Sequence, residues 1–261
     1  MMNHSDISEV VRTLQDGILI VKMNRPEKKN ALSHSMYRAL TAALQGADND
    51  GAVRVVVLCG VPGAFTSGND LMDFLKNPLL GEESPVLAFL YALAGLKKPL
   101  MAAVEGLAVG IGATLLLHCD YVCAGETSTF QLPFVNLGLV PEAGSTLLMP
   151  QMLGHLRASE LLLFGETFTA TTAKEAGFVS TISPDDEVMA TILARARQLA
   201  AQPAAAVRQT KALLKRSTDA GLHETLRVEA EIFMQRLSSP EAGEALQAFA
   251  QRRRPDFSRF E

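Results

Sequence analysis

The sequence lacks the features that several common classes of protein require. Its 261 residues carry a net charge of −4, and they contain no long run of lysine or arginine. A nucleic-acid-binding protein would cluster such residues to neutralise phosphates. The one dense basic spot, "RRR" at 252–254, follows a helical pattern, so a solvated helix end and a local anion contact are both open. We therefore expect no nucleic-acid partner.

Cysteine is also scarce. The three cysteines, Cys59, Cys119 and Cys123, lie in or beside apolar runs and lack the spacing of metal ligands. An odd number of such residues predicts reduced thiols in the core, which is typical of a cytoplasmic protein. The N-terminal residues 1–17 have neither an apolar stretch nor an arginine-rich amphipathic face, so we predict no signal or transit peptide.

One hydrophobic run, residues 99–118, is long enough to cross a bilayer. Glu105 lies near its middle, and a proline and several glycines interrupt it. A charged residue at the centre of a membrane span is costly. We therefore predict a buried strand, a turn and a buried helix here, and no membrane association.

The signatures of several enzyme classes are missing. Ser67 and Ser145 lack the glycines of a G-x-S-x-G nucleophile turn, and no H-E-x-x-H or Walker motif occurs. The glycines of "GLAVGIG" (106–112) have the spacing G-x-x-x-G-x-G rather than the dinucleotide-binding G-x-G-x-x-G. His118 lies in an apolar run and is expected to be a core histidine rather than a ligand. The sequence thus predicts no metal and no redox cofactor.

What the sequence does contain is the pattern of a large α/β protein. Apolar residues make up 48% and charged residues 20%, which supports a sizeable core. Strand and helix patterns alternate until about residue 184, and only helical patterns follow. We therefore predict an α/β core over residues 1–200 and a helical C-terminal region over residues 201–261.

Individual elements follow from local patterns. Two strands are predicted around the Asp16-Gly17 turn, a helix with Ser33 as its N-cap, and a strand buried on both faces at 53–60. The C-terminal region is expected to contain several separate helices. One of them has an apolar stripe that packs either on the chain's own core or on another subunit, namely Leu222, Leu226, Phe233 and Leu237.

Two stretches of small residues are suited to binding through the backbone. "GAFTSGND" (63–70) follows the buried strand, and "VGIGA" (109–113) begins a helix. The first amides of a helix lack intrahelical acceptors and carry a positive partial charge. Two such amides from separate turns, aimed at one point, would stabilise an oxygen that gains negative charge. From spacing alone, ordinary tight turns are the simpler explanation.

A single acid, Glu142, lies between a proline and a small-residue turn in "LVPEAGS" (139–145). Helices favour an acid in their first turn, and the helical segment "GSTLLMPQML" (144–153) follows directly. A carboxylate at this place could equally act as a base. The residues alone leave both roles open.

Together, these stretches resemble the crotonase superfamily, also called the enoyl-CoA hydratase/isomerase family, along nearly the whole chain. The resemblance implies a ββα spiral core, a helical C-terminal region that packs in a homotrimer or a dimer of trimers, and acyl-CoA ligands in which coenzyme A is part of the substrate. It also implies an oxyanion hole made by the amides of Ser67 and Ile111. The matching segments are "RPEKKNAL" (25–32), "AFTSGNDL" (64–71), "PLMAAVEGLAVGIGATLLLHCDYVCAGE" (99–126), "FVNLGLVPEAGS" (134–145) and "EAGFVSTI" (175–182).

Within this family, the resemblance favours an isomerase. Hydratases of the family activate water with two glutamates, but this sequence has Thr114 and Phe134 at the corresponding positions. Glu142 resembles the single catalytic glutamate of Δ3,Δ2-enoyl-CoA isomerases, in particular those of the peroxisomal type. An apolar pocket would raise the pKa of Glu142 and strengthen it as a base. Two alternatives stay open, namely another crotonase-type reaction such as hydration, and a non-catalytic acyl-CoA-binding scaffold.

The resemblance also implies a set of substrate-binding residues. Residues 67–71 are expected to contact the pantetheine and the thioester, and apolar side chains to line the acyl chain. Basic residues would bind the adenosine phosphates, including Arg252 or Arg254 reaching across from another subunit. The set comprises Lys28, Lys29, Ala31, Ser67, Gly68, Asn69, Asp70, Leu71, Phe74, Phe134, Leu137 and Arg254.

Overall fold

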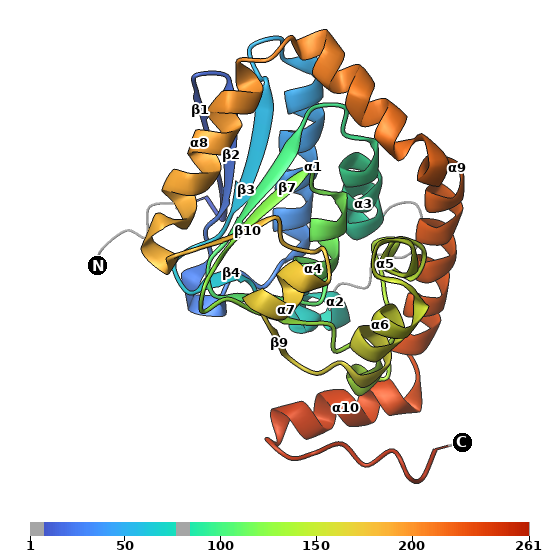
Figure 1. Cartoon of the computed structure of the whole chain (residues 1–261). Helices are drawn as coiled ribbons and strands as arrows, with labels where there is room; N and C mark the ends of the chain where they lie inside the picture. Colours follow the sequence, from blue (N-terminus) through green and yellow to red (C-terminus); the bar gives the residue numbers. More distant parts are fainter. Residues whose placement is uncertain (1–7, 77–83, 261) are drawn as a thin grey trace.

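The computed structural model describes residues 8–76 and 84–260, and within them the chain winds as a spiral between two sheets (Figure 1). The large sheet comprises β1 (Val10–Gln15), β2 (Ile18–Met23), β3 (Val55–Cys59), β5 (Leu100–Val104), β7 (Tyr121–Gly125) and β10 (Thr181–Ser183), in the order β1-β2-β3-β5-β7-β10. The small sheet comprises β4 (Ala64–Thr66), β6 (Leu107–Val109), β8 (Thr129–Gln131) and β9 (Phe168–Thr169), in the order β4-β6-β8-β9. Because successive turns of the chain add a strand to each sheet, the predicted ββα spiral core is confirmed.

Strand pairing is parallel except at two places. β1 and β2 form an antiparallel hairpin around the predicted turn, where Asp16 and Gly17 both have positive φ. β8 and β9 also pair antiparallel. The short strands β4, β6, β9 and β10 were not predicted, because each is a two- or three-residue segment without a clear alternation.

The helices lie around the large sheet and below it. They are α1 (His34–Asn49), α2 (Leu71–Lys76), α3 (Pro85–Gly95), α4 (Ile111–Thr114), α5 (Ser145–Leu153), α6 (His155–Ser159), α7 (Ala170–Glu175), α8 (Val188–Ala200), α9 (Ala204–Leu237) and α10 (Pro240–Ala250). Short turns of tighter or wider helix are η1 (Pro26–Lys28), η3 (Leu115–His118), η4 (Val135–Leu137), η5 (Glu160–Phe164) and η6 (Asp185–Glu187). The Ser33 hydroxyl accepts from the Met36 amide, so the predicted N-cap of α1 is confirmed.

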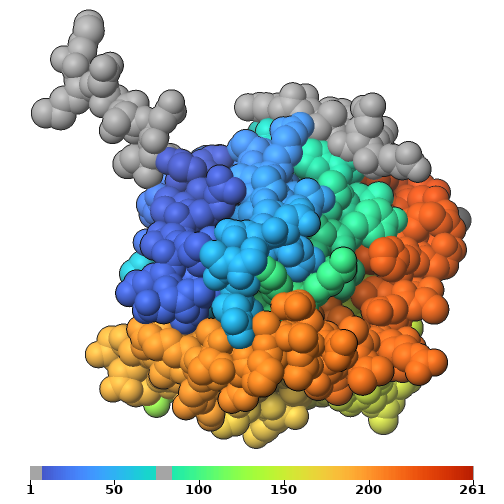
Figure 2. Space-filling model, turned by 90° about the horizontal axis from the view of Figure 1, so that it is seen from above, coloured from blue at the N-terminus to red at the C-terminus, as the bar shows by residue number. Residues whose placement is uncertain are grey.

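The central strands are buried on both faces, as predicted for residues 53–60. Alternate residues of β3 face opposite sides, so that Val55 and Val57 pack with α8 while Val56 and Leu58 join the main core. Ile192 of α8 is fully buried against this second face. Figure 2 shows α8 and the start of α9, in orange, lying along one side of the N-terminal half of the chain.

The hydrophobic run 99–118 folds back on itself. It forms β5, β6, α4 and η3 rather than a continuous helix. Among the described residues, no helix is both long enough and apolar enough to cross a membrane.

The C-terminal region is helical, but α9 is one continuous helix of 34 residues rather than two. Gly221 lowers helix propensity by about 1 kcal/mol relative to alanine, and the packing around it outweighs this cost. The apolar stripe faces the chain's own core, because Leu222, Leu226 and Phe233 are buried there. The predicted boundary at residue 200 falls at the end of α8, and the division into two units stays a prediction.

The layer between α8 and the large sheet gives a direct test of the fold. We expect Ile192→Ala to lower the free energy of unfolding by about 2–5 kcal/mol, because it leaves a cavity against β3 and β5. Ile192→Val should cost only about 0.5–1.5 kcal/mol. Urea denaturation followed by circular dichroism measures both, and equal stability of the two variants and the wild type would contradict this packing.

Candidate active site

Glu142 lies on a tight turn that precedes α5. Ala143 and Gly144 have φ values of 63° and 70°, and α5 begins only at Ser145. Glu142 is therefore outside the helix, whose first turn contains no acid. Its side chain is almost completely buried, since the residue is 5% exposed. The alternative that Glu142 serves as a first-turn acid of this helix is thus wrong.

A different carboxylate stabilises the start of α5. Glu229, from the middle of α9, accepts hydrogen bonds from the amides of Gly144 at 2.6 Å and Thr146 at 2.9 Å. It also accepts from the Thr146 hydroxyl at 2.6 Å. These amides would otherwise be unpaired at the helix start, so Glu229 performs the role that the sequence suggested for Glu142.

The turn is held from its other side by His118. Its Nε2 lies 2.8 Å from the Ala143 carbonyl oxygen, and because a carbonyl only accepts, Nε2 carries the hydrogen. Burial lowers the pKa of His118 to about 4, so the ring is neutral near pH 7. His118 is a hydrogen-bonded core histidine, as predicted.

The surroundings of Glu142 favour its protonated form. Burial raises its pKa, the charge of Glu229 raises it further, and the hydrogen bond from Asn69 lowers it, with a result of about 8. The Asn69 Nδ2 donates to Glu142 Oε1 across 3.4 Å. The buried Tyr37 hydroxyl donates to the Oδ1 of Asn69 and so points the amide nitrogen toward Glu142.

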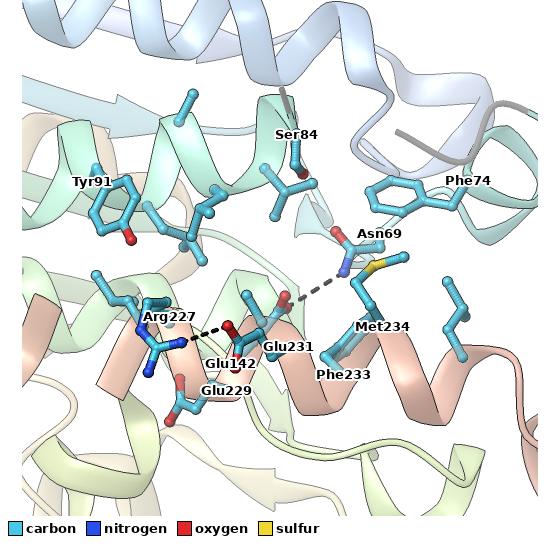
Figure 3. Close-up of a pocket in the computed structure, with 18 of the residues that line it drawn as sticks. Asn69, Phe74, Ser84, Tyr91, Glu142, Arg227, Glu229, Glu231, Phe233 and Met234 are labelled. Atoms are coloured by element: carbon cyan, nitrogen blue, oxygen red, sulfur yellow. Dashed lines mark hydrogen bonds and ion pairs between the residues drawn. The ribbon is translucent and has the colours of Figure 1, made fainter. Parts of the chain in front are cut away.

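Glu142 and Asn69 face a cavity of about 740 Å³ between α3 and α9 (Figure 3). Apolar side chains from both helices and from α2 form most of its wall, among them Phe74, Leu90 and Phe233. Arg227 and Glu231 also line it and form an ion pair with each other. A cavity of this kind can hold an apolar chain next to one buried carboxyl.

The two small-residue loops meet beside this cavity. Gly68 has a φ of 92°, and a Cβ atom there would lie 2.9 Å from the Val109 carbonyl oxygen. A Cβ on Gly112 would lie 2.6 Å from a methyl group of Thr66. Only glycine permits these approaches, so both glycines serve to bring the backbones of residues 66–69 and 109–112 together.

The hydrogen bonds of the first loop correct the predicted oxyanion donor. The amide of Ser67 donates to the Lys29 carbonyl at 3.0 Å. The amides of Gly68 and Asp70 are also paired, with the Thr66 hydroxyl and the Leu32 carbonyl. The amide of Asn69 has no acceptor among the described residues. Asn69, rather than Ser67, therefore offers the free amide in this loop.

The second predicted donor, Ile111, stays a prediction with which the structure is consistent. Ile111 is the first residue of α4, so its amide has no intrahelical acceptor. Thr114, one turn further on, is fully buried and donates to the Gly110 carbonyl at 3.3 Å. Phe134 is buried next to Gly110.

The predicted substrate-binding residues fall into two groups. The first group, Asn69 and Phe74, lines the cavity. The second group lies outside the cavity wall and comprises Lys28, Lys29, Ala31, Ser67, Gly68, Asp70, Leu71, Phe134, Leu137 and Arg254. Within it, the Lys28–Lys29 turn is exposed beside Ser67, whose hydroxyl donates to the Lys28 carbonyl at 3.2 Å. Arg254 is exposed beyond α10.

Asp70 has a structural partner instead of a free carboxylate. Its Oδ2 lies 2.8 Å from Nη1 of Arg25, which also donates to the Ala31 carbonyl. Burial acts to raise the pKa of Asp70, but the hydrogen bonds and charge of Arg25 and the amides of Met72 and Asp73 outweigh it and lower the pKa. Asp70 thus holds the loop in place through Arg25, and its contact with a substrate stays a prediction.

Sequence analysis missed Glu229, although a signal for it exists. The stripe Leu222, Leu226 and Phe233 leaves one helical position between its last two members, and residue 229 occupies it. A charged residue within an apolar stripe is buried and therefore needs polar partners. Its partners, Gly144 and Thr146, are more than 80 residues away in sequence, as the hydrogen bonds show.

The chain is similar to known proteins of one family. A family model of enoyl-CoA hydratase/isomerase matches residues 13–259. The 2,3-dehydroadipyl-CoA hydratase of Escherichia coli is 34% identical over 96% of this chain and 99% of that protein. Enoyl-CoA delta isomerase 2 of Rattus norvegicus is 34% identical over 94% of this chain and 64% of that protein. The solved structure of Pseudomonas aeruginosa OdaA is 43% identical, covers 92% of this chain and 98% of its own, and has a TM-score of 0.90. The chain is an enzyme that belongs to the enoyl-CoA hydratase/isomerase family.

Proposed function

We propose that this enzyme is a Δ3,Δ2-enoyl-CoA isomerase in which Glu142 is the single catalytic base. The observation that carries the proposal is the buried carboxyl of Glu142 in the wall of an apolar cavity, beside two converging backbone loops. The other buried carboxyl of this wall, that of Glu229, is occupied by the amides of Gly144 and Thr146. At the two positions where hydratases of the family carry glutamates, this chain has Thr114 and Phe134. Neither side chain can act as a base near neutral pH.

The reaction needs one proton to be moved between two carbons. In a 3-enoyl-CoA, the hydrogens at C2 are acidic because the thioester carbonyl accepts the electron pair. Glu142 takes one of these protons, the C2–H bond breaks, and a dienolate forms with much of its charge on the thioester oxygen. The protonated carboxyl then gives the proton to C4. The double bond moves from C3–C4 to C2–C3, and Glu142 returns to its ionised form.

The backbone stabilises the charged intermediate. We assign the two donors to the amides of Asn69 and Ile111, because the Ser67 amide is occupied by Lys29. Donors fixed in advance at a developing oxyanion are each worth on the order of 3 kcal/mol of barrier. The Asn69 residue would thus act twice, through its amide on the thioester oxygen and through its side chain on Glu142.

The environment of Glu142 suits a base of this kind. A carboxyl with a pKa of about 8 binds a proton far more strongly than an exposed one, and it is still partly ionised near neutral pH. The apolar wall of the cavity also keeps bulk water from the dienolate. The same wall, built from α3 and α9, would hold the acyl chain.

Two parts of the binding scheme stay proposals. Lys28 and Lys29, exposed beside Ser67, would bind the phosphates of coenzyme A, and Arg254 would be supplied by another subunit. A homotrimer would cover apolar side chains that are exposed in one chain, namely Leu156, Leu163, Phe164 and Phe249. Contacts of this type are typical of subunit interfaces.

A hydratase that uses Glu142 alone is the second candidate. The Escherichia coli relative, which the chain matches over almost its full length, is named a hydratase. Hydration of a 2-enoyl-CoA and isomerisation of a 3-enoyl-CoA are distinguished by assaying both substrates separately. Turnover restricted to the 2-enoyl substrate, with a 3-hydroxyacyl product, would replace the isomerase proposal, and no turnover of either would favour a non-catalytic acyl-CoA-binding protein.

The role of Glu142 is tested by Glu142→Gln. We expect the kcat for 3-enoyl-CoA isomerisation to fall by about 10²–10⁴-fold, because the amide cannot take a proton. The affinity for a saturated acyl-CoA, measured by calorimetry, should change little, which separates loss of the base from loss of the site. Undiminished turnover by this variant would remove Glu142 from the mechanism.

The ionisation of Glu142 should set the pH dependence. Because the base must be ionised, kcat/KM of the wild type should rise with pH and level off above an apparent pKa near 8. Initial rates between pH 6 and pH 9.5 measure this rise. A profile that is already flat at pH 6 would show that the base has an ordinary carboxyl pKa.

The same burial should make stability depend on pH. An exposed carboxyl loses its proton near pH 4.5, whereas folded Glu142 keeps its proton up to about pH 8. Unfolding therefore releases a proton in this window, and the stability due to residue 142 falls as the pH rises through it. Thermal melts at several pH values should show Glu142→Gln gaining on the wild type from pH 5 to pH 8, with no further gain above. A constant difference in melting temperature would contradict the raised pKa.

A further inference from the structure

Glu229 is a buried acid that the proposed chemistry does not use. It lies in the middle of α9, is 5% exposed, and has all of its described hydrogen bonds with Gly144 and Thr146. Glu142 is two residues before Gly144 in the same turn. Figure 3 shows Glu142 and Glu229 as neighbours in the wall of the cavity.

We propose that Glu229 is a positioning residue for the reaction, which fixes the turn that carries Glu142 and, through its negative charge, makes Glu142 a stronger base. This inference rests on the proposed role of Glu142 as the base. Glu229 itself touches no reacting atom in this scheme.

The positioning part follows from the backbone. Ala143 and Gly144 are both in the left-handed conformation, which for alanine is unfavourable and persists only where neighbours hold it. His118 holds the Ala143 carbonyl from below, and Glu229 holds the Gly144 amide from α9. Loss of either contact would allow the turn to relax and Glu142 to move, and a displacement of about 1 Å can cost on the order of 10²-fold in rate.

The electrostatic part follows from which charges face Glu142. From α9 these are Glu229 and the Arg227–Glu231 pair, in which Arg227 is further neutralised by Glu224. The other elements contribute neutral groups, namely Tyr37 of α1, Asn69 of the first loop, Tyr91 of α3, and His118 of η3. His223, also on α9, stacks on Tyr91. Burial raises the pKa of Glu229 itself, and the hydrogen bonds from Thr146 and Gly144 act to lower it. In its ionised form, Glu229 is the nearby charge that acts most on Glu142, and it favours the protonated carboxyl there.

Asn69 provides a comparison of opposite sign. Its hydrogen bond to Glu142 favours the ionised form, whereas the charge of Glu229 disfavours it. Removing Asn69's side chain should therefore raise the apparent pKa of the reaction, and removing the charge at 229 should lower it. A change that merely loosens the structure gives no reason for two opposite shifts.

The test is the pH profile of kcat/KM for 3-enoyl-CoA isomerisation in the wild type and four full-length variants. In Glu229→Gln we expect the midpoint to move down by roughly one pH unit, and kcat at pH 9 to fall about tenfold or more. In Asn69→Ala the midpoint should move up. In Glu229→Asp, which keeps the charge but is too short for the Gly144 amide, the midpoint should stay near that of the wild type while kcat falls. Asp219→Asn, at an exposed acid of the same helix that lies outside the cavity wall and outside the Arg227 ion pairs, should leave both quantities unchanged.

The outcomes separate this inference from the proposed function. If Glu142→Gln is inactive but Glu229→Gln keeps the wild-type midpoint and kcat, Glu229 has no part in the reaction and the base assignment stands. A lower kcat with an unmoved midpoint in Glu229→Gln would overturn the electrostatic role. If Glu229→Gln does not fold, the other two variants still test the inference. Glu229→Asp must then show a lower kcat with the midpoint of the wild type, and Asn69→Ala must show a midpoint at higher pH.

Discussion

The active site depends on one unfavourable arrangement, a carboxyl group held out of water beside a second carboxylate. Such a group is costly to bury in its ionised form, so the protein must stabilise it by other means. It does so with the Asn69 amide, which Tyr37 orients, and with a turn that α9 and η3 hold from two sides. The surrounding apolar side chains of the cavity exclude bulk water from this carboxyl.

The spiral explains why the two backbone loops meet at this carboxyl. Each loop follows a strand, since residues 67–69 come after β4 and residues 110–112 come after β6, and these two strands pair in the small sheet. Parallel neighbours end at the same edge, so the loops are adjacent whatever their side chains are. Gly68 and Gly112 then allow the two backbones to approach closely, as the proposed oxyanion hole requires.

Much of this could be predicted from sequence, and what could not be has identifiable physical causes. Buried strands, the Ser33 cap and the Asp16-Gly17 turn are local features, and local spacing revealed them. Glu142 stood out because of its neighbours and the family resemblance. Ser67 was predicted as an oxyanion donor because the hydrogen bond of its amide to the Lys29 carbonyl joins segments far apart in sequence, and local spacing does not reveal it. Glu229 was missed for the same reason, since its hydrogen-bond partners are distant in sequence. The continuity of α9 was missed because the helical segments on both sides of Gly221 look complete by themselves.

The length of α9 has a consequence for the size of acyl group that fits. This helix is attached to the rest of the chain at three places along its length. Lys211 donates to Asp120 and to the Lys98 carbonyl. Glu229 accepts from the amide at the start of α5, and Arg236 donates to the Gly138 carbonyl. α3, on the opposite side of the cavity, is tied to α9 by the hydrogen bond from Lys215 to the Ala94 carbonyl and by the stacking of Tyr91 on His223. None of these contacts involves the turn that carries Glu142, so substitutions on the cavity side of α3 are expected to alter chain-length preference and leave that turn in place.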